Sequence, residues 1–211
     1  MSSMTAETRG RPRIHADEEI LAAALRAFAV QGYDAMSLRA LNSELGLAHG
    51  TINQRFGSKE RLYFAAVDHG FATFLAEINQ QRAARPKPTS DLDDLAELVR
   101  AFLLANIERP ELCRLMNTEG LQHSDRLDHI VRTVVQPAFM PAARTLRRLV
   151  KAGTIRPITG RALFFLVAHG AEAPYTLVAL SSAFDAEDGP LDAVEHAEQM
   201  TAFIMRGLRP D

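Results

Sequence analysis

A run of short polar side chains between residues 48 and 54 has the composition of a surface that reads DNA bases. Asn53 and Gln54 each carry an amide that donates and accepts together, the pattern that pairs with the N6 and N7 edge of adenine. Thr51 has a methyl group that can meet a thymine methyl, and Gly50 lets the backbone come close. Ala48 and His49 complete the surface. We expect Asn53 or Gln54 to read a base directly; a phosphate contact or a solvated amide is the alternative.

Groups suited to DNA phosphates stand on both sides of this run. Ser37 and Lys59 each lie at the expected start of a helix, where free backbone N–H groups point outward and favour an anion. Arg39 follows Ser37 by two residues. We expect these three residues to anchor the DNA backbone and to carry little sequence information.

The first 14 residues form a polar segment with its own positive charge. Arg9, Arg11 and Arg13 face only one acid in this segment, Glu7. An Arg-Gly-Arg-Pro-Arg arm can lie in a narrow minor groove, because arginine is drawn to the negative potential there. A solvated tail is the alternative, and beside a base-reading surface we favour the DNA contact.

A second set of chemistry-bearing residues is scattered over the C-terminal part of the chain. The acids and histidines that could be gathered into one site are Glu119, His123, Asp125, His129, His169 and Glu172. His169 and Glu172 are three residues apart, so they would share a helical face. A metal site built from these groups is conceivable. Satisfied polar residues in a core are another reading. We favour a third, in which Asn117, Glu119 and His169 orient a ligand in an apolar cavity and His123 and Glu172 belong to the same ligand site.

The apolar wall of such a cavity would come from aromatic and sulfur-containing side chains. The candidates are Phe71, Phe74, Phe102, Met116, Phe139, Phe165 and Tyr175. Plain core packing is the alternative for each of them, because large apolar side chains are mostly buried in any helical protein.

Two short helical patterns position the polar run. Leu38, Leu41 and Leu45 recur at helical spacing behind Ser37, which can cap the first helix. Gly46 then supplies the residue that tolerates positive φ at a tight turn. The second pattern buries Leu47, Ile52 and Phe56 and leaves the polar run on its other side. The arrangement is a helix-turn-helix with an exposed second helix.

The spacing of this segment resembles the N-terminal domain of the TetR family of bacterial transcriptional regulators. The residues that carry the resemblance are Ser37, Leu41, Gly46, Leu47, Gly50, Thr51, Ile52, Phe56, Ser58, Lys59 and Leu62. Three positions depart from the family pattern: Asn42 replaces alanine, Ala48 replaces a capping serine, and Asn53 replaces a tyrosine that touches a phosphate. The resemblance implies a three-helix head, a homodimer, and a body in which some of the aromatic residues border a cavity.

The rest of the chain reads as further helices. We expect them at about residues 17–31, 58–84, 91–107, 111–119, 125–135, 137–152, 160–183 and 190–208. Residues 160–183 are apolar nearly all round, so this helix must be covered on several sides. With residues 190–208, it would form a four-helix dimer interface, two helices from each subunit. The apolar face of residues 190–208 is made of Leu191, Val194, Ala197, Met200, Thr201 and Ile204.

Composition places limits on the class of protein. The 211 residues are 47% hydrophobic, with few β-branched side chains, so we expect an all-α protein. The net charge is −2, so any DNA-binding surface must be a local patch. Cys113 is the only cysteine, and no signal peptide is visible, which indicates a cytoplasmic protein. No catalytic motif is present, so we expect no enzyme and no cofactor. The most hydrophobic stretch, Leu163 to Leu180, is interrupted by His169, Gly170, Glu172 and Pro174, so we expect a buried or dimer helix there and no membrane span.

The predicted organisation has three parts. Residues 1–14 form a basic arm, residues 15–62 a DNA-binding domain, and residues 63–211 a ligand-binding and dimerisation domain. The predicted function is a dimeric, ligand-responsive regulator, most simply a repressor released from palindromic operator DNA by a small apolar effector. The alternative is a small-molecule-binding or adaptor protein of the same fold that no longer binds DNA specifically.

Overall fold

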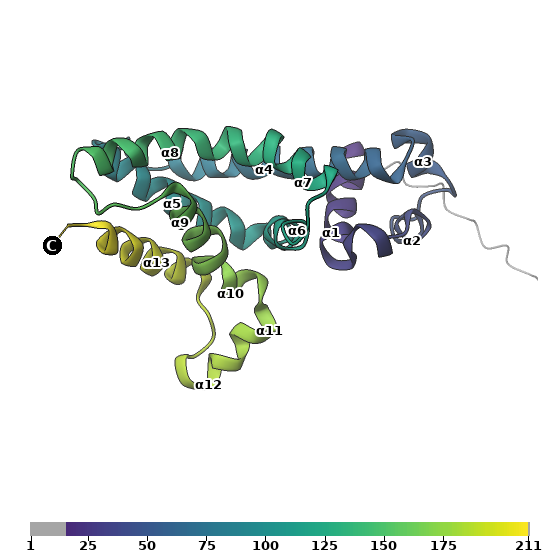
Figure 1. Ribbon diagram of the computed structural model, residues 1–211. Coiled ribbons are helices and arrows are strands. Elements are labelled where there is room, and N and C mark those ends of the chain that lie inside the picture. The colour runs from purple at the N-terminus through teal and green to yellow at the C-terminus, as the bar shows by residue number, and fades with distance from the viewer. Residues whose placement is uncertain (1–15, 211) are drawn as a thin grey trace, which may run out of the picture.

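The computed structural model describes residues 16–210, which fold into helices with no strand among them (Figure 1). The all-α class is therefore confirmed. The helices are α1 (Asp17–Ala35), α2 (Leu38–Glu44), α3 (Thr51–Phe56), α4 (Lys59–Ala83), α5 (Asp91–Glu108), α6 (Pro110–Glu119), α7 (Asp125–Ile130), α8 (Gln136–Lys151), α9 (Gly160–Phe165), α10 (Ala173–Thr176), α11 (Val178–Ser181), α12 (Asp185–Asp188) and α13 (Ala193–Leu208). Two π-helical segments, Val131–Val135 and Leu166–Ala171, link α7 to α8 and α9 to α10, and a 3-10 turn, Ser182–Phe184, links α11 to α12.

The first three helices and the start of α4 form the head. Ile20, Phe28, Leu41 and Ile52 are fully buried there, one apolar face from each of the three helices. Gly32 has a φ of +78°, so α1 bends at the residue where the sequence predicted its end and continues to Ala35.

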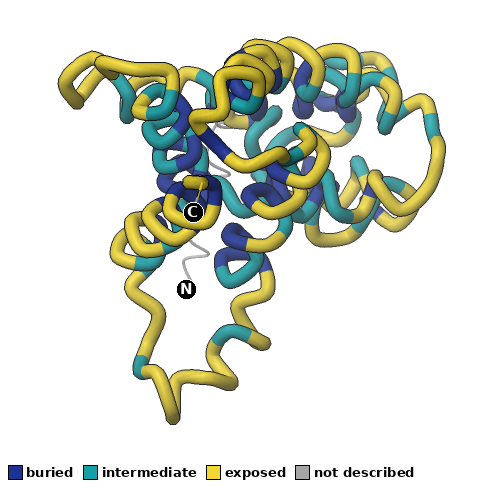
Figure 2. Tube along the Cα trace, turned by 60° about the vertical axis from the view of Figure 1, so that its left-hand side comes forward, coloured by how far each residue is buried: buried dark blue, intermediate teal, exposed yellow. Residues whose placement is uncertain are grey.

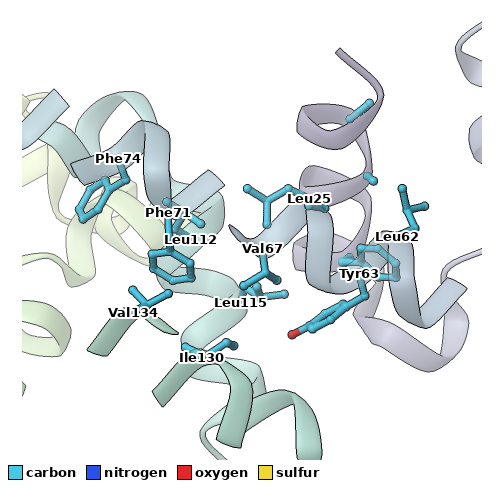
Figure 3. Close-up of a cluster of buried hydrophobic side chains, with 14 of the residues drawn as sticks. Leu25, Leu62, Tyr63, Val67, Phe71, Phe74, Leu112, Leu115, Ile130 and Val134 are labelled. Carbon is cyan, nitrogen blue, oxygen red and sulfur yellow. The ribbon is translucent and has the colours of Figure 1, made fainter. Parts of the chain in front are cut away.

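The head core continues into the body without a gap. Its cluster of buried side chains runs from Leu62 through Val67 and Phe71 on α4 to Leu112 on α6 (Figure 3). A second cluster, in which Leu103 and Leu146 are fully buried, joins α5, α8, α9 and α13. Because α4 belongs to the head at one end and to the body at the other, a change in the body can be transmitted along it.

The predicted helix at residues 160–183 is wrong as a single element. It begins as α9, passes through a π-helical segment and α10, and breaks at Leu177, where the chain bends by 78° into α11 and α12. No single helix of the described range is long and apolar enough to cross a membrane; this bent pair, Gly160–Thr176 and Val178–Asp188, meets that test by length and composition alone.

The bend sends an arm away from the body. The arm, defined as residues 177–191, projects from the edge of the molecule opposite α8 (Figure 1), and it is exposed along nearly its whole length (Figure 2). Pro190, predicted as the first residue of the last helix, lies in the arm; α13 starts after Asp192, whose side chain accepts hydrogen bonds from the Val194 and Glu195 amides.

Candidate DNA-reading surface and ligand cavity

Local chemistry shapes the helix-turn-helix as the sequence predicted. Ser37 caps α2 by accepting a hydrogen bond from the Ala40 amide at 3.4 Å. Gly46 and Gly50 have φ values of +63° and +80°, so the two positions that turn the chain from α2 into α3 both adopt the left-handed conformation that glycine favours. The second helix is thereby held against α2 with its polar side turned outward.

Asn42 joins the two helices in a way that its position in the sequence does not reveal. Its side chain is buried, donates from Nδ2 to the Leu38 carbonyl at 2.8 Å, and accepts at Oδ1 from the Ile52 amide at 3.3 Å. Ile52 lies in the first turn of α3, where amides have no partner within their own helix. Asn42 therefore caps α3 from the neighbouring helix, in a chain that has Ala48 where the family has a capping serine. The only sequence signal was an asparagine on an otherwise apolar face.

The predicted base-reading residues form one surface on and before α3. His49, Asn53 and Gln54 are exposed, and Ala48 beside them is exposed as well. Gly50 and Thr51 are half-buried, and the Thr51 hydroxyl is used locally, donating to the Ala48 carbonyl at 2.8 Å. Asn53 and Gln54 thus remain the amides with room to meet a base edge.

The predicted phosphate anchors differ in whether their side chains already have partners within the protein. Ser37 and Arg39 are exposed on α2. The Lys59 ammonium donates to the Asp34 carbonyl at 3.0 Å and lies 4.9 Å from the centre of the Tyr33 ring, so it also ties the end of α1 to the start of α4. Arg9, Arg11 and Arg13 lie outside the described residues.

An elongated cavity of about 330 Å³ lies between the two clusters of the core. Along α4 its wall is made by Phe71, Phe74, Leu75, Ile78, Asn79 and Arg82, one face of the helix over three turns. Along α5 the wall runs from Asp94 to Asn106, and α6, α8 and α9 close the remaining sides. Because the lining follows two helices for about 16 Å, the space is long and narrow rather than round.

Polar groups sit at the two ends of this cavity. At one end Arg82 and Asp94 form an ion pair, with Asn79 and Thr145 nearby in the wall. At the other end Asn106 donates to the Phe102 carbonyl and accepts from the Cys113 thiol at 2.8 Å. The wall between them is almost wholly apolar, so the cavity suits an elongated apolar molecule with polar ends.

Five of the twelve predicted ligand residues line this cavity: Phe71, Phe74, Phe102, Met116 and Phe139. The other seven lie elsewhere: Asn117, Glu119, His123, Phe165, His169, Glu172 and Tyr175. The polar lining residues that sequence reasoning missed are Asn79, Arg82, Asp94, Asn106, Cys113 and Thr145. In the sequence, these residues differ from other polar residues only in lying next to the apolar face of their helix.

Most of the seven have partners inside the protein. His169 Nδ1 lies 2.6 Å from Asn117 Oδ1, and the Tyr175 hydroxyl donates to the Ala193 carbonyl at 2.9 Å. His123 and Phe165 are exposed. The structure therefore does not bring His169 and Glu119 to one ligand, and within residues 16–210 no three His, Cys, Asp or Glu side chains gather as a metal site would require.

Glu172 is a fully buried carboxyl group with one oxygen unpartnered within the described range. Burial raises its pKa from the usual 4.5 to about 7, and the neighbouring polar groups of Cys113 and Thr176 only partly oppose that rise. Cys113 lies between Glu172 and the cavity, so this carboxyl group is separated from a ligand by one side chain.

Glu119 closes a contact between the body and the head. Arg126 Nε donates to both of its carboxylate oxygens, at 2.9 and 3.0 Å, and the Arg126 guanidinium lies 4.3 Å from the centre of the Tyr33 ring at the end of α1. Burial and the Glu119 carboxylate raise the pKa of Tyr63, the neighbouring ring on α4. Since α6 carries Cys113 and Met116 on the cavity and Glu119 at its end, one short helix touches both functional regions.

Comparison with known proteins agrees with this geometry. Residues 20–66 match the model of the bacterial regulatory proteins of the tetR family. Over 100 residues the chain is 31% identical to the HTH-type transcriptional repressor AcnR of Corynebacterium efficiens, a match that covers 47% of this chain and spans about half, 46%, of that repressor.

Solved structures share the fold over nearly the whole length. A regulatory protein of the tetR family from Rhodococcus RHA1 superimposes with a TM-score of 0.65 at 21% identity, covering 92% of this chain and 98% of that one. A TetR transcriptional regulator from Chloroflexus aurantiacus gives a TM-score of 0.65 at 22% identity, covering 92% and 96%. The head and the body lead to one conclusion: residues 20–66 carry the sequence pattern of the tetR family of bacterial regulatory proteins, and the described chain has the fold of solved proteins of that family.

Proposed function

We propose that the protein is a homodimeric transcriptional repressor, which binds a palindromic operator and leaves it when a small apolar molecule enters the body. In this proposal residues 1–14 and 15–62 hold the DNA, and residues 63–211 bind the effector and the second subunit. Ser37, Arg39 and Lys59 serve as backbone anchors, and Asn53 and Gln54 read bases.

The observation that carries the proposal is the shared position of α4 and α6. Both helices line the cavity, and both pack against α1 in the head. A molecule too large for the empty cavity displaces α6 or α4 when it enters, and the head moves with them. The effector then favours a spacing of the two heads that no longer fits two grooves one turn apart.

Exposed apolar side chains support a dimer. Four large apolar side chains of the last helices are between 41% and 66% exposed. They are Phe165 at the end of α9, Leu166 directly after it, and Val194 and Phe203 on α13. A second subunit would cover large apolar side chains that one subunit leaves exposed. A two-fold axis between two such bodies makes the operator an approximate palindrome.

The cavity favours an effector without net charge. Arg82 and Asp94 already neutralise each other at one end, and the groups at the other end, Asn106 and Cys113, are neutral hydrogen-bonding groups. A buried ligand charge would have no partner there and would cost desolvation free energy. We therefore propose an elongated apolar molecule with one or two uncharged polar groups, such as hydroxyl, amide or ester.

The DNA part is tested with the region upstream of the protein's own gene and of its neighbour, in a mobility-shift assay at several salt concentrations. The wild type should bind one fragment with a steep salt dependence. On an operator set varied one base pair at a time, Asn53→Ala should lose about 1–3 kcal/mol of discrimination at a single A·T position. A uniform loss at every position would instead show that Asn53 touches the backbone.

The effector part is tested with neutral alkyl compounds of graded length, by thermal shift and by release of the bound fragment. Ala142→Phe fills the cavity from α8 and should block release while leaving DNA binding intact. Ala152→Phe, which is exposed at the end of the same helix and does not line the cavity, is the matched control. Equal release in Ala142→Phe and the control would place the effector elsewhere.

A protein of this fold that binds a ligand but no specific DNA is the second candidate. The observation in its favour is that the Lys59 ammonium is held by the Asp34 carbonyl and that Asn53 is too short for the usual phosphate contact. If no fragment is bound more tightly than random DNA at any salt concentration, while neutral alkyl compounds still raise the melting temperature, this candidate replaces the repressor.

A further inference from the structure

Charge is segregated along the body of this protein. Residues 129–171 contain seven Lys and Arg and no acid, whereas residues 172–205 contain seven Asp and Glu and neither Lys nor Arg. In a chain with a net charge of −2, such blocks create surfaces of opposite sign on one molecule.

The positive block forms a stripe along α8. Arg144, Arg147 and Lys151 recur at intervals of three and four residues, so they share one face of the helix, and Arg132 extends the row from the π-helical segment before it. We call these four residues the basic stripe. All four are exposed, and none forms an ion pair with another residue of the 16–210 range. Exposed Met140 lies on the same face, between Arg132 and Arg144.

The negative block includes the arm, which has a hollow that matches such a stripe. A space of about 350 Å³ between the arm and the body is lined by the apolar side chains Leu177, Leu180 and Phe184 together with Asp185 and Asp188. Both aspartates are exposed, and neither forms an ion pair with another residue in the described part of the chain. Long basic side chains suit this hollow, because their methylene stems cover apolar surface while their charged ends meet carboxylates.

Within one subunit the two surfaces cannot meet. Figure 1 shows α8 along the upper edge of the body, the arm below the lower edge, and the head at one end. They can meet between subunits. Two heads reach one stretch of DNA only if both point the same way, so the two-fold axis runs from the bodies toward the heads, roughly along α4. A half-turn about that axis exchanges the upper and lower edges. With the second body in front of or behind the first in the view of Figure 1, the partner's arm then lies at the edge where α8 runs.

We propose that the arm of each subunit docks on the basic stripe of the other, as two equivalent contacts that clasp the dimer. The inference rests on the proposed dimer and adds the surfaces that hold it. Asp185 and Asp188 pair with Arg144 and Arg147 of the second copy, and the exposed leucines and Phe184 of the arm are covered by α8 with its Met140. The clasp also explains how an arm without a single buried residue between Val178 and Asp188 is kept from water.

Disulfide trapping tests the contact. Cys113 is 4% exposed, so introduced cysteines react without competition from it. The single variants Arg147→Cys and Asp188→Cys are mixed, allowed to exchange subunits, and oxidised mildly. The mixture should give a cross-linked band of dimer size on a non-reducing gel, and neither variant alone should. Arg147→Cys mixed with Glu44→Cys, whose new thiol lies on the head, is the control and should give none.

Charge reversal gives a second, independent readout. Arg144→Glu with Arg147→Glu should raise the dimer dissociation constant by about tenfold at low salt, and little at high salt. Adding Asp185→Arg and Asp188→Arg to the same chain should restore most of the affinity. Circular dichroism checks that each variant is folded.

The outcomes separate this inference from the proposed function. A dimer in light scattering that gives no band in the mixture, and no rescue by the second pair, overturns the clasp and leaves the dimer standing. A monomer at micromolar concentration overturns both. In the double variant with both Arg147→Cys and Asp188→Cys, each chain carries two introduced thiols; a ladder of larger cross-linked species from this variant shows an open chain of contacts and overturns the reciprocal arrangement. A lipid surface is the remaining alternative. It is assigned to the stripe if the wild type sediments with anionic phospholipid vesicles, the Arg144→Glu, Arg147→Glu variant does not, and the cysteine mixture gives no cross-link.

Discussion

At the scale of single residues, two buried polar side chains carry functional meaning that their types alone do not show. Asn42 satisfies an orphan amide of α3, and Glu172 remains partly unsatisfied inside the body. Buried polar groups are costly unless paired, so the first stabilises the reading surface and the second makes the body sensitive to pH.

Replacing Asn42 with alanine should weaken DNA binding and stability together. The Ile52 amide would lose its acceptor in a buried setting, which costs about 1–3 kcal/mol. The loss should appear as a lower free energy of unfolding in urea and as a weaker operator complex. Ser43→Ala, on the exposed side of the same helix, is the control and should change neither by more than about 0.5 kcal/mol.

Replacing Glu172 with glutamine should flatten the dependence of stability on pH. A carboxyl group with a raised pKa holds its proton more tightly in the folded protein than in the unfolded chain. The stability it contributes is full below about pH 4.5 and falls as the pH rises to about 7, by roughly 1 kcal/mol per pH unit. In Glu172→Gln the free energy of unfolding, measured in urea from pH 5 to 8, should lose this slope. Exposed Glu187→Gln should keep it, and an unchanged slope in Glu172→Gln would contradict the assignment.

At the scale of elements, α6 is the helix through which we propose that an effector acts on the head. Met116 touches the cavity, and three residues later Glu119 holds Arg126 against the Tyr33 ring. A shift of α6 therefore changes a packed ion pair beneath the head. Such a contact has few intermediate arrangements, which suits a two-state response.

Arg126→Ala should uncouple the cavity from the head. The variant should still bind the effector, since Arg126 does not line the cavity, but the ratio of operator affinities without and with effector should fall severalfold. The measurement is an operator titration at saturating and at zero concentration of an active alkyl compound. Gln122→Ala, exposed in the turn before α7, is the control. A full response in Arg126→Ala would place the coupling in α4 alone.

At the scale of the whole molecule, α13 shows how an apolar face divides between the core and the surface. The sequence predicted one face for the dimer, made of Leu191, Val194, Ala197, Met200, Thr201 and Ile204. In the structure Ala197, Thr201 and Ile204 are buried within the same subunit, where α13 packs on α5. The large apolar residues that this helix leaves exposed are Val194 and Phe203.

Phe203→Asp should therefore split the dimer and leave the fold intact, because Phe203 is 66% exposed in one subunit. Light scattering should give a monomer, circular dichroism an unchanged helical spectrum, and operator binding should be lost. Ile204→Asp puts a charge into the core at a residue that is 2% exposed, and should unfold the subunit itself. A dimeric Phe203→Asp protein would show that the interface lies elsewhere.

The sequence by itself determined the helices and the head, because their signals are local. Ser37, Ser58, Ser90 and Ser124 each precede a helix and each caps it in the structure. Gly46 turns the chain at the predicted position. A cap, a turn or an apolar period acts within a few residues, so it can be read without knowing the fold.

Only the tertiary structure decided which polar residues face the cavity and where the last apolar stretch bends. Glu119 and His169 were predicted to orient a ligand, but each has a partner in the protein, Arg126 and Asn117. Asn79, Arg82 and Asp94 lie on the cavity because α4 and α5 are rotated so that those positions face each other. That rotation is set by the summed packing of helices distant in sequence, and no stretch of the chain records it alone.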